Sequence, residues 1–428
     1  MADTTSSPLY RSVWKWHFLA ALYVLPFMLI LSVTGGIYLF KPQIEEFIYS
    51  DLLNVEIQAQ KTTLETQQAA VLAAAPGSRI RSITTEETEG RSTVFEIQDS
   101  NRTRSYAWVD PYSAEVIRVQ DRESTLMYQL KKIHSELLLG ETGAKFVEIA
   151  AHWAIVMFIT GFFLWWPRGK GGIMKAFRLP KGTGRPWWKQ THLLTGIFAS
   201  LLIIPMLISG LPWTDVWGSG YSYVQSQTGQ KSPSLRFSGG SIKSTATEGE
   251  TIAYETVLIA ASEQGLVTPY ELRPPKNAQG AYWIRSASKN RWDQTELIID
   301  QYSGKVLTSV NFEDYPVMAK ASSLGVSFHQ GELYGWLNLA QNSLAACLGV
   351  ILAVSGFAAW WTRRPVGSLG VPAAPQRNIK LGTGITALIV FLAIFLPLMG
   401  VSLVVAMLLD WLIFKRLNWF RSKADVIA

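Results

Sequence analysis

Long apolar runs alternate with polar segments along the chain, and each run is close to the length of a membrane-spanning helix. A helix that crosses the hydrocarbon core of a bilayer needs about 20 predominantly apolar residues. The runs predict four spans, near residues 18–40, 144–166, 193–213 and 340–361. A fifth apolar stretch, 381–414, would measure about 50 Å as one straight helix, longer than the roughly 30 Å core. Pro397 and Gly400 therefore predict a break within it.

Two polar inserts separate the spans, and each has the pattern of a small α+β domain. The first has a helical pattern at 63–75, followed by alternating stretches near 79–85, 92–98, 103–110 and 114–120. The second repeats this order, with a helix at 251–262 and strands near 268–273, 280–286, 294–300 and from 305 onwards. A Gly- and Ser-rich stretch, 217–248, precedes the second helix and predicts a flexible loop at the outer membrane surface.

The two halves of the chain follow one plan. Trp14-Lys15-Trp16-His17 opens the first apolar run, and Trp188-Lys189 with His192 opens the third, where the histidine lies 175 positions after His17. In both runs a glycine, Gly35 or Gly210, follows the histidine after 18 residues. The second spans of each half match at an offset of 195, where the pairs are His134 and His329, Gly140 and Gly335, Gly161 and Gly356, Trp165 and Trp360, and Arg168 and Arg363. An order of helix, insert and helix, used twice, explains both offsets.

These patterns predict a membrane α-helical bundle, with four core transmembrane helices in two repeats, a C-terminal hydrophobic segment, and two small α+β domains on one side. The predicted parts are transmembrane helix 1 (1–41), the first domain (42–130), helix 2 with an outer linker (131–168), a basic loop (169–190), helix 3 (191–216), a loop with the second domain (217–328), helix 4 with an outer linker (329–364), and a final loop, hydrophobic segment and basic tail (365–428).

Basic residues predict the orientation. The loop 167–190 carries seven Lys or Arg and no acid, and the loop 362–380 carries four and no acid, so both should be cytoplasmic. Arg11 and Lys15 then place the N-terminus inside and both inserts outside. A basic tail after residue 414 also prefers the cytoplasm, which favours a hairpin or re-entrant form for 381–414. The net charge of +7 follows from these flanks and needs no nucleic-acid partner.

Further features agree with a multi-pass membrane protein. The chain is 48% hydrophobic and only 17% charged. Lys41-Pro42 follows the first apolar run where a cleavable signal would have a small-residue site, so we expect this run to remain as an anchor. The single cysteine, Cys347, allows no intramolecular disulfide.

Four of the five histidines form two repeat-related pairs, His17 with His192 and His134 with His329. An ionisable side chain in a membrane span is a functional candidate, and imidazoles from two helices can supply both axial ligands of a haem iron. Gly161 lies about 10 Å in from the basic end of its helix, where a macrocycle could lie flat against it. The alternative is that these histidines are interfacial and the glycines only allow close helix packing.

The outer pair needs a bend in the chain. His134 precedes Trp165 by 31 residues, or about 46 Å of straight helix, and Gly140 and Gly143 are the expected bending points. With a bend, His134 lies at the outer mouth of the bundle opposite His329. The alternative is that both are surface histidines of linkers between the inserts and the membrane.

His152 is the remaining candidate. It shares one helical face with Glu141, Lys145 and Glu148. Three interpretations stay open, namely an axial ligand, a proton-handling group, or a packed histidine whose imidazole Glu148 satisfies.

Several sequence blocks together resemble a known family. They are His17 with its run to Thr34-Gly35 and Tyr38-Leu39-Phe40, His134 to Glu141, Leu164 to Arg168, His192 to Trp213, His329 to Glu332, and Trp360 to Pro365. With them, essentially the whole chain resembles the PepSY-associated transmembrane proteins, and within these the di-haem siderophore-iron reductases of bacterial inner membranes.

The resemblance implies PepSY modules in the inserts, an inner-membrane location and an oxidoreductase activity. It also implies two b haems per chain, with His17, His192, His134 and His329 as ligands to the haem iron. The implied reaction reduces the iron of a ferric siderophore outside the membrane and releases Fe(II), because the hard oxygen ligands of a siderophore suit Fe(III) better.

The motifs that the sequence lacks limit the source of electrons. We find no Rossmann glycine fingerprint, P-loop, HExxH motif or GxSxG elbow, so electrons must come from a cytoplasmic reductant or from membrane quinol. Trp213, Trp217, Tyr221 and Tyr223 either line a substrate pocket or form an interfacial aromatic belt. Two rival functions remain, a quinol-linked or other metal reductase, and a non-redox scaffold whose inserts bind partner proteins.

Overall fold

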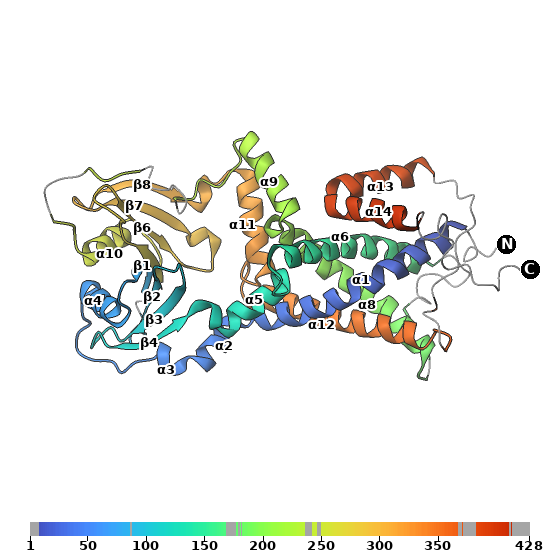
Figure 1. Cartoon of the computed structure of the whole chain (residues 1–428), viewed down its shortest axis with the longest axis horizontal. Coiled ribbons are helices and arrows are strands. Elements are labelled where there is room, and N and C mark those ends of the chain that lie inside the picture. The colour runs from blue at the N-terminus through green and yellow to red at the C-terminus, as the bar shows by residue number, and fades with distance from the viewer. Residues whose placement is uncertain are drawn as a thin grey trace, which may run out of the picture. The chain divides into compact units, whose positions relative to one another are not determined.

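The computed structural model describes residues 8–85, 88–167, 177–178, 180, 182–235, 242–245, 250–366, 370, 382–410 and 412 (Figure 1). The chain divides into two compact units. We call residues 1–36, 133–222 and 341–428 the membrane unit, and residues 37–132 and 223–340 the insert unit.

Among the described residues, four helices are long and apolar enough to cross a membrane, as predicted. They are α1 (Pro8–Tyr38), α6 (Gly140–Trp165), α8 (Arg185–Gly210), which the short 3-10 helix η3 (Leu211–Trp213) extends, and α12 (Trp336–Trp361). Three of these helices meet in a packed apolar cluster formed by Phe158, Ala199, Ile203 and Ala345. The repeat-related spans therefore form one bundle around a shared core.

The last apolar stretch is bent where the sequence predicted a break. Helix α13 (Thr383–Phe395) and helix α14 (Pro397–Asp410) meet at an angle of 116°. Pro397 has no N–H to continue the first helix, and it begins the second, where a proline is well tolerated. The pair packs on α6, where the indole Nε1 of Trp153 donates to Ser402 Oγ at 2.9 Å. The bend agrees with the predicted hairpin or re-entrant form, and its place in a membrane stays a prediction.

The insert unit is built on one antiparallel sheet of eight strands within the described residues. Its order is β4-β3-β2-β1-β5-β6-β7-β8. The strands are β1 (Arg79–Thr85), β2 (Thr93–Gln98), β3 (Arg104–Val109), β4 (Val116–Asp121), β5 (Tyr270–Arg273), β6 (Ala281–Ser286), β7 (Thr295–Asp300) and β8 (Val306–Asn311). All eight lie at or within two residues of the predicted stretches.

The prediction of two separate domains needs correction, because the two inserts share this sheet. Strand β1 of the first insert pairs with β5 of the second, with Ile83 opposite Leu272 and Thr85 opposite Tyr270. An unpaired edge strand exposes a row of backbone donors and acceptors. Pairing β1 with β5 satisfies both edges at once, which explains why two similar four-stranded sheets join here.

Two helices cover one face of the sheet and join the repeats a second time. They are α4 (Leu64–Ala74) and α10 (Tyr254–Glu263). Glu65 accepts a hydrogen bond from the N–H of Tyr254 at 2.6 Å, and Glu255 accepts one from the N–H of Leu64 at 3.3 Å. Each helix thus caps the start of the other. The two helices and the facing strand residues form one apolar core that includes Val71, Ile83, Phe95, Val257, Leu272, Ile284 and Leu297.

Shorter helices connect the sheet to the spans. They are α2 (Lys41–Ile48), α3 (Ser50–Leu53), η2 (Arg122–Ser124), α5 (Leu126–Glu136), α9 (Val216–Gln227), η5 (Arg291–Asp293), η6 (Phe312–Asp314) and α11 (Val317–His329).

Helix α9 corrects the prediction of a flexible loop over 217–248. Both carboxylate oxygens of Glu148, from α6, accept hydrogen bonds at its start, from the N–H of Val216 at 2.9 Å and of Trp217 at 2.8 Å. Gly218 permits the close approach of the Pro212 carbonyl, which a side chain at this position would block. A cap supplied by a distant helix leaves no local sequence signal. Residues 236–241 and 246–249 of the predicted loop lie outside the described residues.

Some of the basic residues that predicted orientation lie outside the described residues. They are Arg168, Lys170, Lys175, Lys181, Arg377 and Lys380, together with the tail from 413 onwards. The cytoplasmic N-terminus and the external inserts therefore stay predictions.

Candidate functional site

His17 lies on α1 and contacts α6. Its Nδ1 is 2.9 Å from Thr160 Oγ1. The Thr160 hydroxyl has its own acceptors one turn back, the carbonyls of Val156 at 3.0 Å and Met157 at 3.1 Å. Because the hydroxyl donates to a carbonyl, it accepts from His17 Nδ1–H. The neutral imidazole then carries its lone pair on Nε2.

His192 lies at the repeat-related position on α8 and contacts α12. Its Nδ1 is 3.1 Å from the carbonyl oxygen of Leu352. A carbonyl only accepts, so Nδ1 carries the hydrogen and Nε2 carries the lone pair. His17 and His192 thus hold equivalent places in the two halves, each with Nδ1 engaged by an oxygen of another helix.

His134 has the same arrangement near the other end of the spans. Its Nδ1 is 3.1 Å from Thr34 Oγ1, and that hydroxyl donates to the carbonyl of Ile30 at 2.7 Å. The threonine therefore accepts from Nδ1–H, as Thr160 does for His17.

The bend that this position requires is present between α5 and α6. Leu137, Leu138 and Gly140 adopt positive φ angles of 53°, 60° and 60°, which confirms the predicted change of direction. A side chain at Gly143 would collide with the carbonyl of Glu136, so this position also requires a glycine.

Glycines on neighbouring helices lie directly against the histidine rings. A Cβ atom at Gly161 would lie 3.3 Å from His17 Cε1, one at Gly356 would lie 3.0 Å from His192 Cε1, and one at Gly35 would lie 2.9 Å from His134 Cε1. The sequence left open whether Gly161 contacts a macrocycle or only allows close helix packing. In the structure the first contact of Gly161 and of Gly356 is the imidazole, and it is the same contact in both halves.

His329 ends α11 in the insert unit. The turn that follows it contains Gly331 and Gly335 at positive φ angles of 77° and 66°. The buried Asn338 holds this turn, donating to the carbonyl of Phe328 at 3.2 Å and accepting from the N–H of Leu333 at 3.0 Å. His134 and His329 therefore both lie beside a glycine-containing turn that leads into a membrane span.

His152 is fully buried on α6. Its Nε2 lies 3.7 Å from Glu148 Oε1, which is too long for a hydrogen bond. Among the described residues, neither ring nitrogen has a hydrogen-bond partner. The interpretation in which Glu148 satisfies the imidazole is therefore wrong, because this carboxylate caps α9. A buried polar group without a partner costs about 1–3 kcal/mol, so His152 remains a candidate for ligand binding or proton handling.

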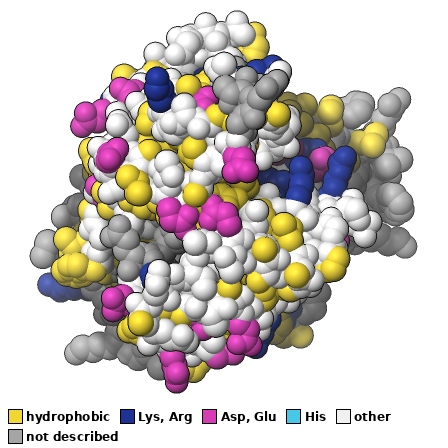
Figure 2. All heavy atoms as spheres, turned by 90° about the vertical axis from the view of Figure 1, so that its left-hand side faces the viewer, with side chains coloured by type: hydrophobic (Ala, Val, Ile, Leu, Met, Phe, Trp, Pro, Cys, Tyr) yellow, Lys and Arg dark blue, Asp and Glu magenta, His cyan; other side chains and the backbone are white. Residues whose placement is uncertain are grey.

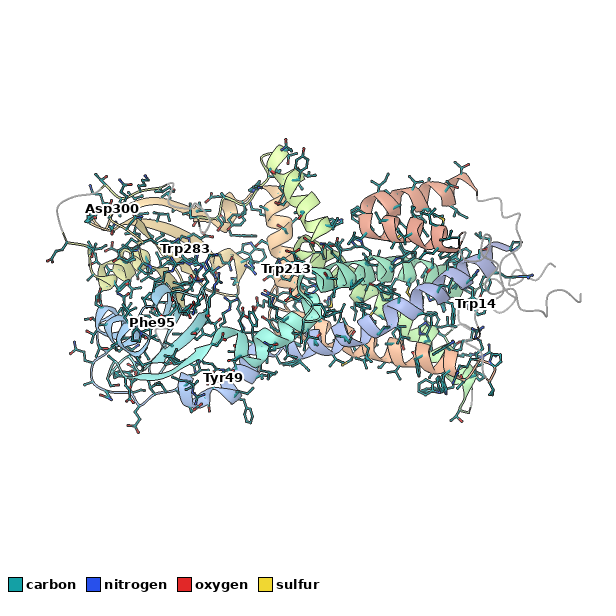
Figure 3. The ribbon with its side chains drawn as sticks, in the orientation of Figure 1. Trp14, Tyr49, Phe95, Trp213, Trp283 and Asp300 are labelled. Atoms are coloured by element: carbon teal, nitrogen blue, oxygen red, sulfur yellow. The ribbon has the colours of Figure 1, made fainter. Side chains whose placement is uncertain are left out.

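The aromatic residues near α9 have structural contacts. Trp217 stacks on Tyr221 with ring centres 5.3 Å apart, and its Nε1 donates to the carbonyl of Phe395 at 3.0 Å. Trp213, labelled in Figure 3, is 51% exposed. Trp217 and Tyr221 thus hold α9 against α13, and the exposed Trp213 agrees with the interfacial interpretation.

The donor set fits a haem better than a bare metal ion. Groups of three or more His, Cys, Asp or Glu that could hold a metal ion are absent from the part of the chain that the structure describes. A haem iron needs only two axial ligands from the protein, since the macrocycle supplies the rest. His17 and His192, each with its lone pair on Nε2, are of the residue type that could supply such ligands.

Comparison with known proteins gives one finding. The model of the PepSY-associated TM region family matches residues 14–363. No curated protein matches the chain.

Proposed function

This chain belongs to the PepSY-associated transmembrane family, and from that premise we propose that it is a membrane electron carrier that binds two b haems. His17 and His192 are the ligands of the inner haem, and the repeat in the sequence predicts His134 and His329 as the ligands of the outer haem. The acceptor is a ferric siderophore on the side of the inserts. The donor is a cytoplasmic reductant or membrane quinol.

One observation carries the proposal. Three histidines make the same kind of hydrogen bond, each through its Nδ1 atom. His17, His134 and His192 each engage an oxygen acceptor of another helix through Nδ1. A metal-binding histidine usually donates its second N–H in this way, because the bond fixes the tautomer and the ring orientation. A packed histidine would also need a partner for its ring N–H, so the support lies in the use of the same nitrogen, Nδ1, at all three sites, which leaves Nε2 for a ligand.

The residues of the chain have distinct tasks in this proposal. A bound haem supplies one-electron chemistry, with a potential that its axial ligands and surroundings tune. Thr160 and the Leu352 carbonyl orient the inner ligands, and Thr34 orients His134. Gly161 and Gly356 let the rings lie against the neighbouring helix. His152, buried without a hydrogen-bond partner among the described residues, is the group that handles a proton.

The inner ligands can be tested by counting haems. We expect His17→Ala and His192→Ala each to lower the haem content of the purified protein from two per chain to one, as measured by the pyridine haemochrome spectrum. Thr191→Ala, next to His192 in the chain, is the matched control and should keep both haems. Full haem content in both histidine variants would contradict this assignment.

The two rival functions predict other results. A quinol-linked or other metal reductase would hold the same haems but would not be oxidised by a ferric siderophore. A scaffold that binds partner proteins through its inserts would show no haem spectrum at all.

A further inference from the structure

The face of the sheet opposite α4 and α10 carries a cluster of arginines. We call Arg79, Arg81, Arg104, Arg122, Arg273 and Arg285 the arginine face. In Figure 2, acidic and basic side chains both lie scattered over the surface that faces the viewer. The strands of the sheet contain six arginines, namely Arg118 and five members of this set, and no lysine, while Arg122 lies in η2. Arginine is the residue suited to planar oxyanions, because its guanidinium donates two parallel hydrogen bonds.

The alternation of the strands places these side chains on one face. Leu272 and Ile284 point into the core, so their neighbours Glu271, Arg273 and Arg285 point to the other side. In β1 the pairing register shifts between Ile80 and Ser82. This β-bulge lets Arg81 join the polar face, where it donates to Gln98 Oε1 at 3.0 Å. The β1–β5 pairing then sets Arg81 of the first repeat beside Arg273 of the second.

The charges on this face do not balance. Glu96 lies 3.8 Å from Arg81, 3.7 Å from Arg104 and 3.3 Å from Arg122. Glu271 lies 3.0 Å from Arg273 and 2.6 Å from Arg285. Among the described residues, these five arginines lie within ion-pair distance of two carboxylates, which are only 20% and 12% exposed. A third carboxylate, Glu296 of β7, lies opposite Arg285 and accepts a hydrogen bond from Trp283 Nε1 at 3.0 Å. The arginines still outnumber the carboxylates. An ion-pair network that served stability alone would match its charges, because like charges at short distance repel.

The excess charge affects Arg81 most directly. Burial lowers its pKa below the usual value, and the guanidinium groups of Arg104, Arg79 and Arg273 lower it further, against the opposite effect of Glu96. An anion on this face would relieve that repulsion.

Two of the arginines are also held in place by an aromatic ring. The guanidinium of Arg273 lies 4.5 Å from the ring centre of Trp283, and that of Arg285 lies 5.7 Å from it (Trp283 is labelled in Figure 3). Such cation–π contacts orient a guanidinium without neutralising its charge. The face therefore presents arranged positive charge before any ligand arrives.

We propose that the arginine face binds a multiply charged oxyanion, and that this ligand is an anionic ferric chelate with catecholate or carboxylate oxygens. The identification of the anion as a ferric chelate rests on the proposed function. Catecholate and carboxylate oxygens give the ferric complex excess negative charge. Three hydroxamates cancel the charge of Fe(III), so an uncharged trihydroxamate complex would gain little from the arginines.

The test is a binding measurement with redox-inert probes. The full chain, in nanodiscs of zwitterionic lipid, is titrated with the gallium(III) complex of a hexadentate tris-catecholate and with that of a trihydroxamate. We expect the anionic complex to bind more tightly, and its affinity to fall as salt rises. Since gallium(III) is not reduced under these conditions, binding is measured independently of haem and electron transfer.

Variants with opposite expected effects make the test sharper. Arg81→Gln and Arg273→Gln should each weaken binding of the anionic complex roughly tenfold, the equivalent of one charge-assisted hydrogen bond. Glu96→Gln should tighten it, because three arginines lose their competing carboxylate. Arg118→Gln is the matched control, since Arg118 pairs one-to-one with Asp51 at 3.4 Å, and it should bind as the wild type does.

Each contrary result has a clear meaning. Equal affinity for the anionic and uncharged complexes, or weaker binding in Glu96→Gln as well as in the arginine variants, would overturn the anion site. Inorganic phosphate binding as tightly as the anionic complex would overturn its assignment to a chelate. A chain that binds the gallium complex as expected but holds no haem would refute the proposed function and leave the anion site standing.

Discussion

Replacing Glu148 with alanine tests how a buried carboxylate on α6 holds α9. Glu148 is fully buried, and its two oxygens accept the N–H groups of Val216 and Trp217 at 2.9 and 2.8 Å. An ordinary helix cap contributes about 1 kcal/mol, and a hydrogen bond to a charged group about 1.5–3 kcal/mol. With two such bonds removed, we expect Glu148→Ala to destabilise folded α9, relative to its locally unfolded state, by about 3 kcal/mol. Glu148→Gln keeps one acceptor oxygen and should cost about half as much.

Hydrogen exchange of the α9 amides measures this effect directly. A loss of about 3 kcal/mol makes local opening roughly a hundredfold more frequent, so these amides should exchange about a hundredfold faster. Lys145→Gln is the matched control, because Lys145 pairs with Asp215 at 3.6 Å in the same region but is 48% exposed. An exposed ion pair contributes about 0–1 kcal/mol, so exchange should change little. Unchanged exchange in Glu148→Ala would refute the capping role.

Three further predictions address the membrane unit and the insert unit. Gly356→Ala should displace the His192 ring, since the added Cβ would lie 3.0 Å from it, and should alter the low-spin haem spectrum. Gly382→Ala, where the added Cβ meets open space, should leave the spectrum unchanged. His152→Leu should keep both haems but slow electron transfer. Loss of a haem would instead identify His152 as a ligand, and unchanged turnover would leave it as a packing residue. Burial raises the pKa of Tyr282 to about 12, from about 10 in an unfolded chain. The folded unit therefore keeps the phenol neutral where the unfolded chain ionises it, so stability should fall as pH rises from about 10 to about 12. Thermal unfolding should show a smaller fall in Tyr282→Phe, and an identical fall would contradict this.

Local patterns in the sequence were enough to predict the membrane spans and the strands. Apolar runs of bilayer length predicted α1, α6, α8 and α12, and Pro397 predicted the break before α14. Alternation predicted all eight strands, because each has one face on an apolar core. The repeat predicted that His17 and His192 would hold equivalent places, and both lie on a glycine of the next span.

Contacts between distant segments were what the sequence could not predict. The pairing of β1 with β5 depends on two strand edges that meet only in the fold. Helix α9 depends on Glu148, which lies 68 residues earlier in the chain. A sequence rich in Gly and Ser predicts a loop, and nothing near it in the chain indicates that Glu148 caps a helix there. The arginine face could not be predicted for a similar reason. Its members come from both repeats, and only the shared sheet brings them together.

The direction of electron flow tests the central claim most directly. Protein with pre-reduced haems is placed in right-side-out and in inside-out vesicles, and a membrane-impermeant ferric siderophore is added while the haem spectrum is followed. Our account predicts rapid oxidation of the haems only when the siderophore reaches the side of the inserts. Oxidation solely from the opposite side, or the absence of any haem spectrum in the purified protein, would contradict it.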